Sequence, residues 1–270
     1  MALHELGAAE NAMTGEISER QPTSIDTLYE GALRLRQHLS GYRFSIDAVL
    51  LAHFVTRFSG ARLVDLGTGS GVVLLTLLYR WGEAVQEAVG IEAQASLAGL
   101  AVENLASNGF ASKGTILHSD FRLIDKQLAA ESFDLAVCNP PFFALGSGRA
   151  NPGEEERLAR HQVLGGIDEV FAAAAFLVRN RGTVAIIYPA EKLGEAIVMA
   201  RGHRLELKRL QLVYSYPHGE ARARLALLEY RKNGGGGAEV LPPFYIYQQK
   251  NGAFSKEMEN FYRANPASAR

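Results

Sequence analysis

Residues 64–71 read Val-Asp-Leu-Gly-Thr-Gly-Ser-Gly, and this stretch predicts the fold. Apolar residues lead into Asp65 as at the end of a buried strand, and an apolar helical run follows the last glycine. Its three glycines allow a tight turn and a close approach of ligand to backbone; they are Gly67, Gly69 and Gly71. The spacing differs from the G-x-G-x-x-G of dinucleotide sites, and an acid precedes it, which favours a cationic or amino-acid ligand over a pyrophosphate. Taken alone, such a loop can also be a plain strand-to-helix turn.

Strand and helix patterns alternate on both sides of this loop. The apolar runs predict strands at 61–67, 88–93, 114–120, 133–139 and 183–189, and helices at 45–58, 71–81, 96–109, 166–182 and 191–203. Such alternation indicates βαβ units and a parallel sheet. Two further strands, at 207–217 and 221–232, form an expected antiparallel pair at one edge, and residues 242–262 predict a strand, a turn and a short helix.

The next two strands of this series also end in acids, namely Glu92 and Asp120. A carboxylate after the second strand can bind both hydroxyls of a ribose. Asp120 can accept a hydrogen bond from an adenine amino group, and the adjacent Phe121 can cover the ring. Each acid taken singly is more typical of a helix N-cap. Three consecutive strands that each end in an acid favour a nucleoside ligand.

With these three motifs the chain resembles the class I S-adenosylmethionine-dependent methyltransferases over about residues 40–230. The resemblance implies an α/β fold: a Rossmann-like, doubly wound, mostly parallel seven-stranded sheet with an antiparallel edge hairpin. It implies S-adenosylmethionine as cofactor. Its methionine part would lie on Asp65, Thr68 and Gly67–Gly71, its ribose on Glu92, and its adenine on Asp120 with Phe121.

The fourth strand ends in Asn139-Pro140-Pro141-Phe142. Pro-Pro pairs are frequent in simple turns, but this motif, in the family that the chain resembles, marks enzymes that methylate planar nitrogens. The Asn139 oxygen and the Pro140 carbonyl can accept the two N–H bonds of an amine and aim its nitrogen at the methyl group, while Phe142 stacks on the base. Such alignment supplies roughly 7–11 kcal/mol of a barrier. Asn139 would also border the cofactor.

Two further stretches narrow the resemblance. Residues 46–51, Ile-Asp-Ala-Val-Leu-Leu, are similar to the Thr-Asp-Ala-Val-Leu-Leu of bacterial methyltransferases that act on an adenine N6 in the anticodon loop of a valine tRNA, and Leu-Ala-Arg-His-Gln at 158–162 resembles their Ala-Arg-His-Glu run. The likeness implies an RNA substrate, foremost tRNA, and places Asp47 over the cofactor. His161 is more typical of a structural histidine. Guanine N2 of ribosomal RNA and a protein glutamine N5 remain alternative targets.

Charge is unevenly distributed although the net charge is −1. Residues 201–232 hold eight bases and three acids, a surplus that can meet phosphates. Arg209, Arg222 and Arg224 are therefore candidate RNA contacts. A solvated hairpin with basic side chains explains the same pattern equally well.

Composition sets broader limits. Hydrophobic residues make up 47% and charged residues 21% of the 270, as in a soluble globular protein. Cys138 is the single cysteine, which excludes an internal disulfide and fits a reducing cytoplasm. No run predicts a signal peptide or membrane span, and the dispersed histidines predict no metal site. We expect a cytoplasmic monomer or homodimer.

The expected organisation is a flexible tail, residues 1–24, followed by one methyltransferase domain, residues 25–270. Within that domain, residues 25–60 would cover the cofactor, residues 61–232 would form the catalytic core, and residues 240–270 would add a strand, a turn and a helix.

Overall fold

A computed structural model describes residues 22–40, 45–56, 59–140, 166–217 and 222–264. Five parallel strands form the centre of a mixed sheet: β3 (Ala61–Leu66), β4 (Val85–Glu92), β5 (Gly114–His118), β6 (Phe133–Cys138) and β7 (Val178–Pro189). An antiparallel pair, β8 (Leu205–Tyr214) and β9 (Ala223–Lys232), extends the sheet beyond β7. The short strands β10 (Glu239–Val240) and β11 (Phe244–Tyr245) pair with β8, and the sheet order is β10-β8-β9-β7-β6-β3-β4-β5.

This order confirms the predicted doubly wound sheet with an antiparallel edge hairpin. β9 runs against both of its neighbours, β7 and β8, so among the seven long strands of the described residues it alone is reversed. The seven strands from β8 to β5 match the number that the resemblance implies, and β10 and β11 are additions outside them.

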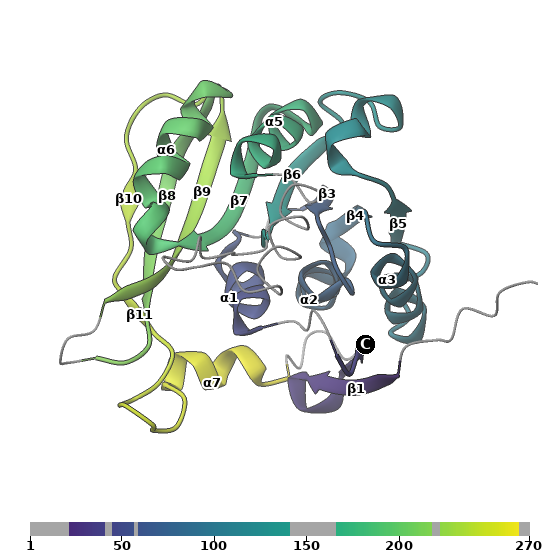
Figure 1. Cartoon of the computed structure of the whole chain (residues 1–270), viewed down its shortest axis with the longest axis vertical. Coiled ribbons are helices and arrows are strands. Elements are labelled where there is room, and N and C mark those ends of the chain that lie inside the picture. The colour runs from purple at the N-terminus through teal and green to yellow at the C-terminus, as the bar shows by residue number, and fades with distance from the viewer. Residues whose placement is uncertain (1–21, 41–44, 57–58, 141–165, 218–221, 265–270) are drawn as a thin grey trace, which may run out of the picture.

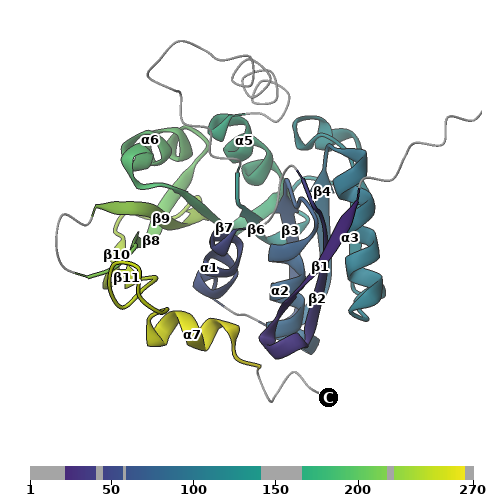
Figure 2. The same cartoon turned by 60° about the horizontal axis from the view of Figure 1, so that its bottom comes forward.

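Helices cover both faces of the sheet (Figures 1 and 2). On one face lie α1 (Ile46–Phe54), α2 (Val72–Trp81), α3 (Ala95–Ser107) and α7 (Lys256–Tyr262), and on the other lie η3 (Phe121–Lys126), α5 (Ile167–Leu177) and α6 (Leu193–Gly202). The short turns η1 (Tyr29–Gly31), η2 (Gly82–Ala84) and η4 (Ala190–Lys192) connect elements. No helix of the described residues is long and apolar enough to cross a membrane.

The central strands are apolar on both faces because both faces are covered. Side chains alternate between the faces, so Leu135 and Val137 of β6 join the core beneath α1 and α2, while Ala136 and Cys138 join the core beneath α5 and α6. Two separate hydrophobic cores therefore hold β6 in place, and with it the segment that follows at its carboxyl end.

One helix is shorter than predicted. The helix expected over residues 166–182 ends at Leu177, and β7 begins at Val178. Arg181 has a φ of 63°, and a Cβ on Gly182 would lie 2.8 Å from the Arg179 carbonyl oxygen. The helix ends because Val178 is already extended and pairs with Phe133 of β6; the chain then turns tightly, and the pairing resumes at Thr183.

An N-terminal hairpin packs beside α3. It consists of β1 (Thr23–Leu28) and β2 (Leu33–His38), so strand structure begins within the predicted tail. The Asn108 side chain accepts from the Arg34 N–H (2.9 Å) and donates to the Arg34 carbonyl (2.7 Å). Asn104 does the same with Arg36 (2.7 and 3.0 Å), and its amide also donates to the Ser70 carbonyl of the glycine loop (2.9 Å). The two amides thus take the place of a neighbouring strand and connect the hairpin to the loop.

Candidate functional site

The glycine loop lies at the carboxyl end of β3 and opens α2. Gly67, Gly69 and Gly71 have φ values of 69°, 59° and 87°, a region that favours glycine. The Gly67 and Thr68 N–H groups both donate to the Ile91 carbonyl, at 2.9 and 3.0 Å, which fixes the loop to the end of β4. The three glycines are therefore required by the backbone itself.

Gly90 of β4 supports this loop, although it lies outside the sequence motifs. A Cβ at Gly90 would lie 2.8 Å from the Thr68 Cγ2 and 2.8 Å from the Ile116 Cδ1. The missing side chain lets the loop lie directly on β4. A glycine within an apolar strand is a signal of such a close approach.

Two buried acids flank the loop. Asp65 is 1% exposed and accepts a hydrogen bond from the Thr68 hydroxyl (2.7 Å). Burial, with a smaller contribution from the nearby Glu92, raises the pKa of Asp65 to about 7. Glu92 is also buried, and burial raises its pKa although the Gly69 and Gln94 N–H groups donate to it at 2.9 Å each. Two acids whose charged forms are disfavoured by burial fit a positively charged ligand group.

Asn139 follows the last residue of β6 and lies beside this loop. It lines a narrow cavity together with Asp65, Gly67, Thr68 and Ala48 of α1. Asn139 is half-buried and Pro140 is buried. Thus the structure brings the strand-end amide and the acid-glycine loop to one place. Pro141, Phe142 and the 158–162 run lie outside the described residues.

Asp47 lies in the first turn of α1, whose N-cap is Ser45. Burial raises the pKa of the Asp47 carboxyl, which is half-buried. The adjacent Ala48 lines the cavity, whereas Asp47 is not one of the residues that line it. The helix therefore reaches the site through its first turn.

Asp120 and Phe121, the predicted adenine contacts, are both engaged with other residues of the fold. Asp120 caps η3 and accepts from the Arg122 N–H (2.9 Å) and from its guanidinium Nε (2.9 and 3.0 Å). The hydrogen bond from Arg122 lowers the pKa of Asp120. Phe121 is buried in the core beneath α5. An adenine amino group would have to share the Asp120 carboxylate with Arg122.

Arg209 is engaged inside the fold. Its guanidinium donates to Glu229 (2.9 Å) and to the Thr56 hydroxyl (2.6 Å), and lies 4.7 Å from the centre of the Phe54 ring. This network joins β8 and β9 to the end of α1. Arg222 and Arg224, in contrast, are exposed. We therefore keep only Arg222 and Arg224 as candidate RNA contacts.

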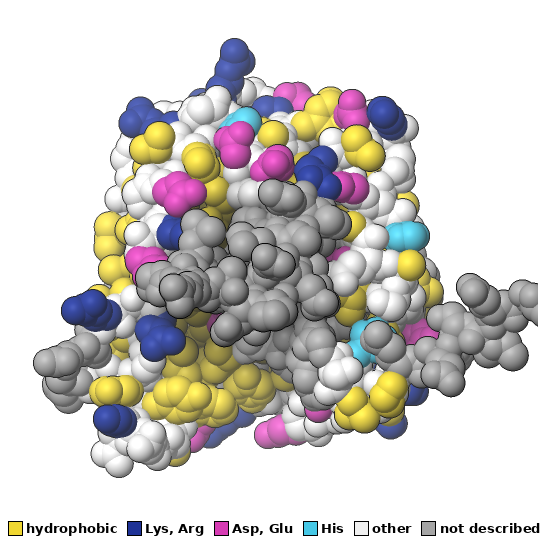
Figure 3. Space-filling view, viewed as in Figure 1, with side chains coloured by type: hydrophobic (Ala, Val, Ile, Leu, Met, Phe, Trp, Pro, Cys, Tyr) yellow, Lys and Arg dark blue, Asp and Glu magenta, His cyan; other side chains and the backbone are white. Residues whose placement is uncertain are grey.

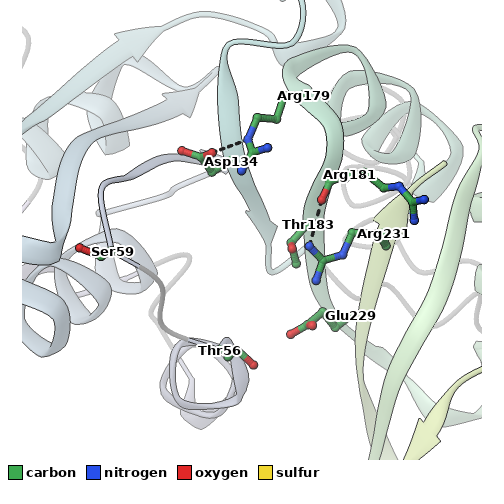
Figure 4. A pocket seen from close by; sticks show the side chains of 8 residues that line it. All are labelled: Thr56, Ser59, Asp134, Arg179, Arg181, Thr183, Glu229 and Arg231. Carbon is green, nitrogen blue, oxygen red and sulfur yellow. Dashed lines mark hydrogen bonds and ion pairs between the residues drawn. The ribbon is translucent and has the colours of Figure 1, made fainter. Parts of the chain in front are cut away.

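A larger cleft, of about 510 Å³, lies at the opposite edge of the sheet (Figure 4). Arg179 pairs there with Asp134 (2.5 Å), and Arg231 donates to the Arg181 carbonyl (2.9 Å). Asp134 lies near the start of β6 and Asn139 just past its end, and five residues of strand span about 16 Å. The cleft is thus separate from the loop and Asn139.

The sequence predicted no metal site, because its histidines are dispersed along the chain. In the described part of the chain, no three His, Cys, Asp or Glu side chains gather as metal ligands. Cys138 is buried, and burial raises the pKa of its thiol well above the usual range. Its position supports packing behind Asn139 rather than a reactive thiolate.

The strand order, the reversed strand and the acid-glycine loop at the carboxyl edge define a class I S-adenosylmethionine-dependent methyltransferase. The family model of the methyltransferase small domain matches residues 45–154. A protein of Porphyromonas gingivalis (strain ATCC 33277) named tRNA1(Val) (adenine(37)-N6)-methyltransferase is 31% identical over 192 residues, which cover 68% of this chain and 73% of the relative. The chain belongs to this family of S-adenosylmethionine-dependent N-methyltransferases.

Other comparisons agree. A protein of Pedobacter heparinus with the same name is 28% identical over 188 residues, covering 70% of this chain and 77% of the relative. A crystal structure from Agrobacterium tumefaciens, described as a predicted O-methyltransferase, superposes with a TM-score of 0.64 at 21% identity, over 81% of this chain and 98% of that one. This last likeness shows the fold alone.

Proposed function

We propose that the protein transfers the methyl group of S-adenosylmethionine to the exocyclic N6 of an adenine in RNA, and that tRNA is its substrate class. The observation that carries the proposal is the shared cavity of Asn139, Asp65 and Gly67. An amide that can hold a planar amine lies beside the loop expected to hold the methyl donor. The names of the relatives, which specify an adenine N6 in a tRNA, support the choice of base and RNA.

In this proposal Asn139 and Pro140 bind the substrate amine. The Asn139 side-chain oxygen and the Pro140 carbonyl each accept one N–H of the amine, which directs its lone pair toward the methyl group. Pro140 is buried, so its carbonyl has little freedom to turn. Pro141 would fix the same segment and Phe142 would stack on the base. The base must be single-stranded or flipped out to reach them.

The cofactor residues have matching roles. S-adenosylmethionine supplies an activated methyl group and carries positive charge, and the buried Asp65 carboxylate would offset that charge. Thr68 would hold Asp65 in place, and the glycines, which lack side chains, would let the amino-acid end of the ligand approach the loop backbone closely. Each Glu92 oxygen accepts one backbone N–H and retains a lone pair for a ribose hydroxyl. Asp47, Asp120 and Phe121 remain proposed cofactor contacts.

The test measures the transfer of labelled methyl from S-adenosylmethionine to unmodified tRNA, ribosomal RNA and protein fractions, with nucleoside analysis of the product. We expect N6-methyladenosine in tRNA. Label on guanosine would replace the adenine by a guanine N2, and label in protein would mean that Asn139 holds a glutamine amide.

A variant tests the role of Asn139. We expect Asn139→Ala to reduce transfer at least a hundredfold while the dissociation constant of S-adenosylmethionine, measured by calorimetry, changes little, because aligned amide contacts act on the substrate nitrogen. Asn180→Ala, an exposed asparagine at the opposite edge, is the matched control. Loss of cofactor binding together with transfer would assign Asn139 a structural role instead.

A further inference from the structure

Four tyrosines gather where β8 and β11 end. They are Tyr214, Tyr216, Tyr245 and Tyr247, and we call them the tyrosine surface. Tyr214 pairs with Tyr245 across the two parallel strands, and their ring centres are 5.7 Å apart. Beyond this pair the two segments stay side by side, because the Ile246 N–H donates to the Tyr214 carbonyl (3.0 Å) and the Tyr247 N–H to the Ser215 carbonyl (2.8 Å). Tyr247 therefore lies next to Ser215, and Tyr216 follows Ser215 directly in the chain.

The exposure of this segment alternates along the chain. Phe244 and Ile246 are buried in the core beneath α1 and α2, whereas Tyr245 is half-buried and Tyr247 is 37% exposed. The Tyr247 ring stacks on Phe254 (5.4 Å), which stacks in turn on Tyr262 of α7 (5.7 Å). The Tyr247 ring is thus supported by two further rings, and its binding to a base would require little further ordering.

The tyrosine surface lies at the same edge of the sheet as Asn139. Cys138 pairs with Ile186, Pro189 with Leu225, and Tyr214 with Ala223, so the ends of β6, β7 and β8 and the start of β9 all face this edge. Three strand spacings separate β6 from β8, about 14 Å across the sheet, and Tyr214 lies three residues, about 10 Å, further along the strand direction than Asn139. A few nucleotides of single-stranded RNA can span this distance from a base held at Asn139.

Positive charge borders these rings. Tyr214 pairs with Ala223 but Val213 pairs with Leu225, so Arg224 is the extra residue of a β-bulge. Bulges redirect a side chain, often next to an active site, and Arg224 is exposed. Arg222 and Lys250 are exposed as well. Figure 3 shows basic and hydrophobic side chains side by side at the lower left of this face, where Figure 1 places β11 and α7.

We propose that the tyrosine surface and Arg224 bind the single-stranded nucleotides that flank the methylated base. This inference rests on the proposed function. Aromatic rings stack on any base, and a neighbouring cation meets the phosphates, which is how proteins hold single-stranded nucleic acid without reading its sequence. The surface then positions the RNA strand, while the selection of the target nitrogen remains with Asn139.

The test uses two probes, a fluorescein-labelled decamer of adenylate and an unmodified tRNA transcript. Stacking of one base is worth enough that Tyr247→Ala should weaken binding of each probe roughly five- to a hundredfold. Tyr247→Phe keeps the ring and should bind like the unaltered protein. Val240→Ala, an exposed apolar residue of β10, is the control. The turnover of Tyr247→Ala at saturating RNA, and its affinity for S-adenosylmethionine, should equal those of the unaltered protein.

Arg224→Ala tests the electrostatic part. We expect the slope of log affinity against log salt to fall by about one phosphate contact. Tyr245→Ala provides a second ring variant, and unfolding midpoints of all variants establish that each one folds.

The outcomes separate this inference from the proposed function. If the unaltered protein methylates RNA and the ring variants bind both probes as it does, the tyrosine surface has another role and the function stands. If the unaltered protein transfers no label to RNA but binds the decamer through Tyr247, the function falls and the RNA surface stands. If it labels protein instead and Tyr247→Ala weakens binding of that protein alone, the assignment to RNA is overturned.

Discussion

Asp65→Asn should change how the free energy of unfolding depends on pH. Burial raises the pKa of Asp65 from 3.8 to about 7, so between these values the folded protein keeps a proton that the unfolded chain has lost. Each pH unit in this window then removes about 1.4 kcal/mol of stability. Below the unfolded pKa the burial of Asp65 has no ionisation cost, and above the folded pKa the full cost is present. Between about pH 5.5 and pH 8 the unaltered protein should lose about 2 kcal/mol through this group.

Asparagine keeps an acceptor for the Thr68 hydroxyl but does not ionise, so Asp65→Asn should not show this loss. Urea unfolding at the two pH values, in the absence of cofactor, measures the difference, and the pH-independent costs of the substitution cancel between them. Asp125→Asn, on the exposed surface of η3, is the matched control. Saturating S-adenosylmethionine should reduce the pH-dependent loss in the unaltered protein, because a nearby positive charge favours the carboxylate. Parallel pH profiles of Asp65→Asn and the unaltered protein would refute the reasoning, since Asp65 would then be ionised throughout.

Two other predictions concern stability. Burial, and secondarily the charge of Arg80, lowers the pKa of His53 to about 3. Below about pH 6.5 the unfolded chain therefore binds a proton that the folded protein does not. The free energy of unfolding should fall by about 2 kcal/mol as the pH falls from about 6.5 to about 5. His53→Phe should remove this loss while preserving the stack on Phe261 (4.0 Å). His53→Phe also removes the hydrogen bond between the Tyr29 hydroxyl and the His53 Nε2 (2.9 Å); Tyr29→Phe removes that bond alone and should retain the loss. An equal acid slope in all three proteins would contradict the assignment. Gly90→Ala should cost about 1–3 kcal/mol in urea unfolding because its Cβ meets Thr68 and Ile116. Gly99→Ala, on the exposed side of α3, should instead stabilise by about 1 kcal/mol, and a stabilising Gly90→Ala would show that the loop yields freely.

The parts of the site that the sequence predicted are those governed by local geometry. Positive φ values require glycine at 67, 69 and 71, and apolar strands must end where a polar ligand site begins. Asp65, Glu92 and Asn139 accordingly appear at the ends of β3, β4 and β6. These rules operate over a few residues, so a single sequence is sufficient to apply them.

Other features depend on partners that are distant along the chain. Arg209 lies in a basic segment, as expected of a phosphate contact. Its guanidinium instead donates to the Phe54 carbonyl and the Thr56 hydroxyl, more than 150 positions earlier in the chain. The pairing of β11 with β8 involves two residues and leaves no periodic pattern. The contact between Arg122 and Asp120 could not be predicted, although the two residues are only two positions apart. A carboxylate that follows a strand can either cap a turn or bind a ligand, and the local sequence is the same in both cases.

The amides of Asn104 and Asn108 have a consequence for the order of assembly. They complete β2 from 68 and 74 residues further along the chain. During synthesis, therefore, the outer edge of the hairpin has no hydrogen-bonding neighbour until α3 has emerged, and contacts of such long sequence separation form late. Because Asn104 also holds the Ser70 carbonyl, the glycine loop likewise gains this contact only after α3 has emerged.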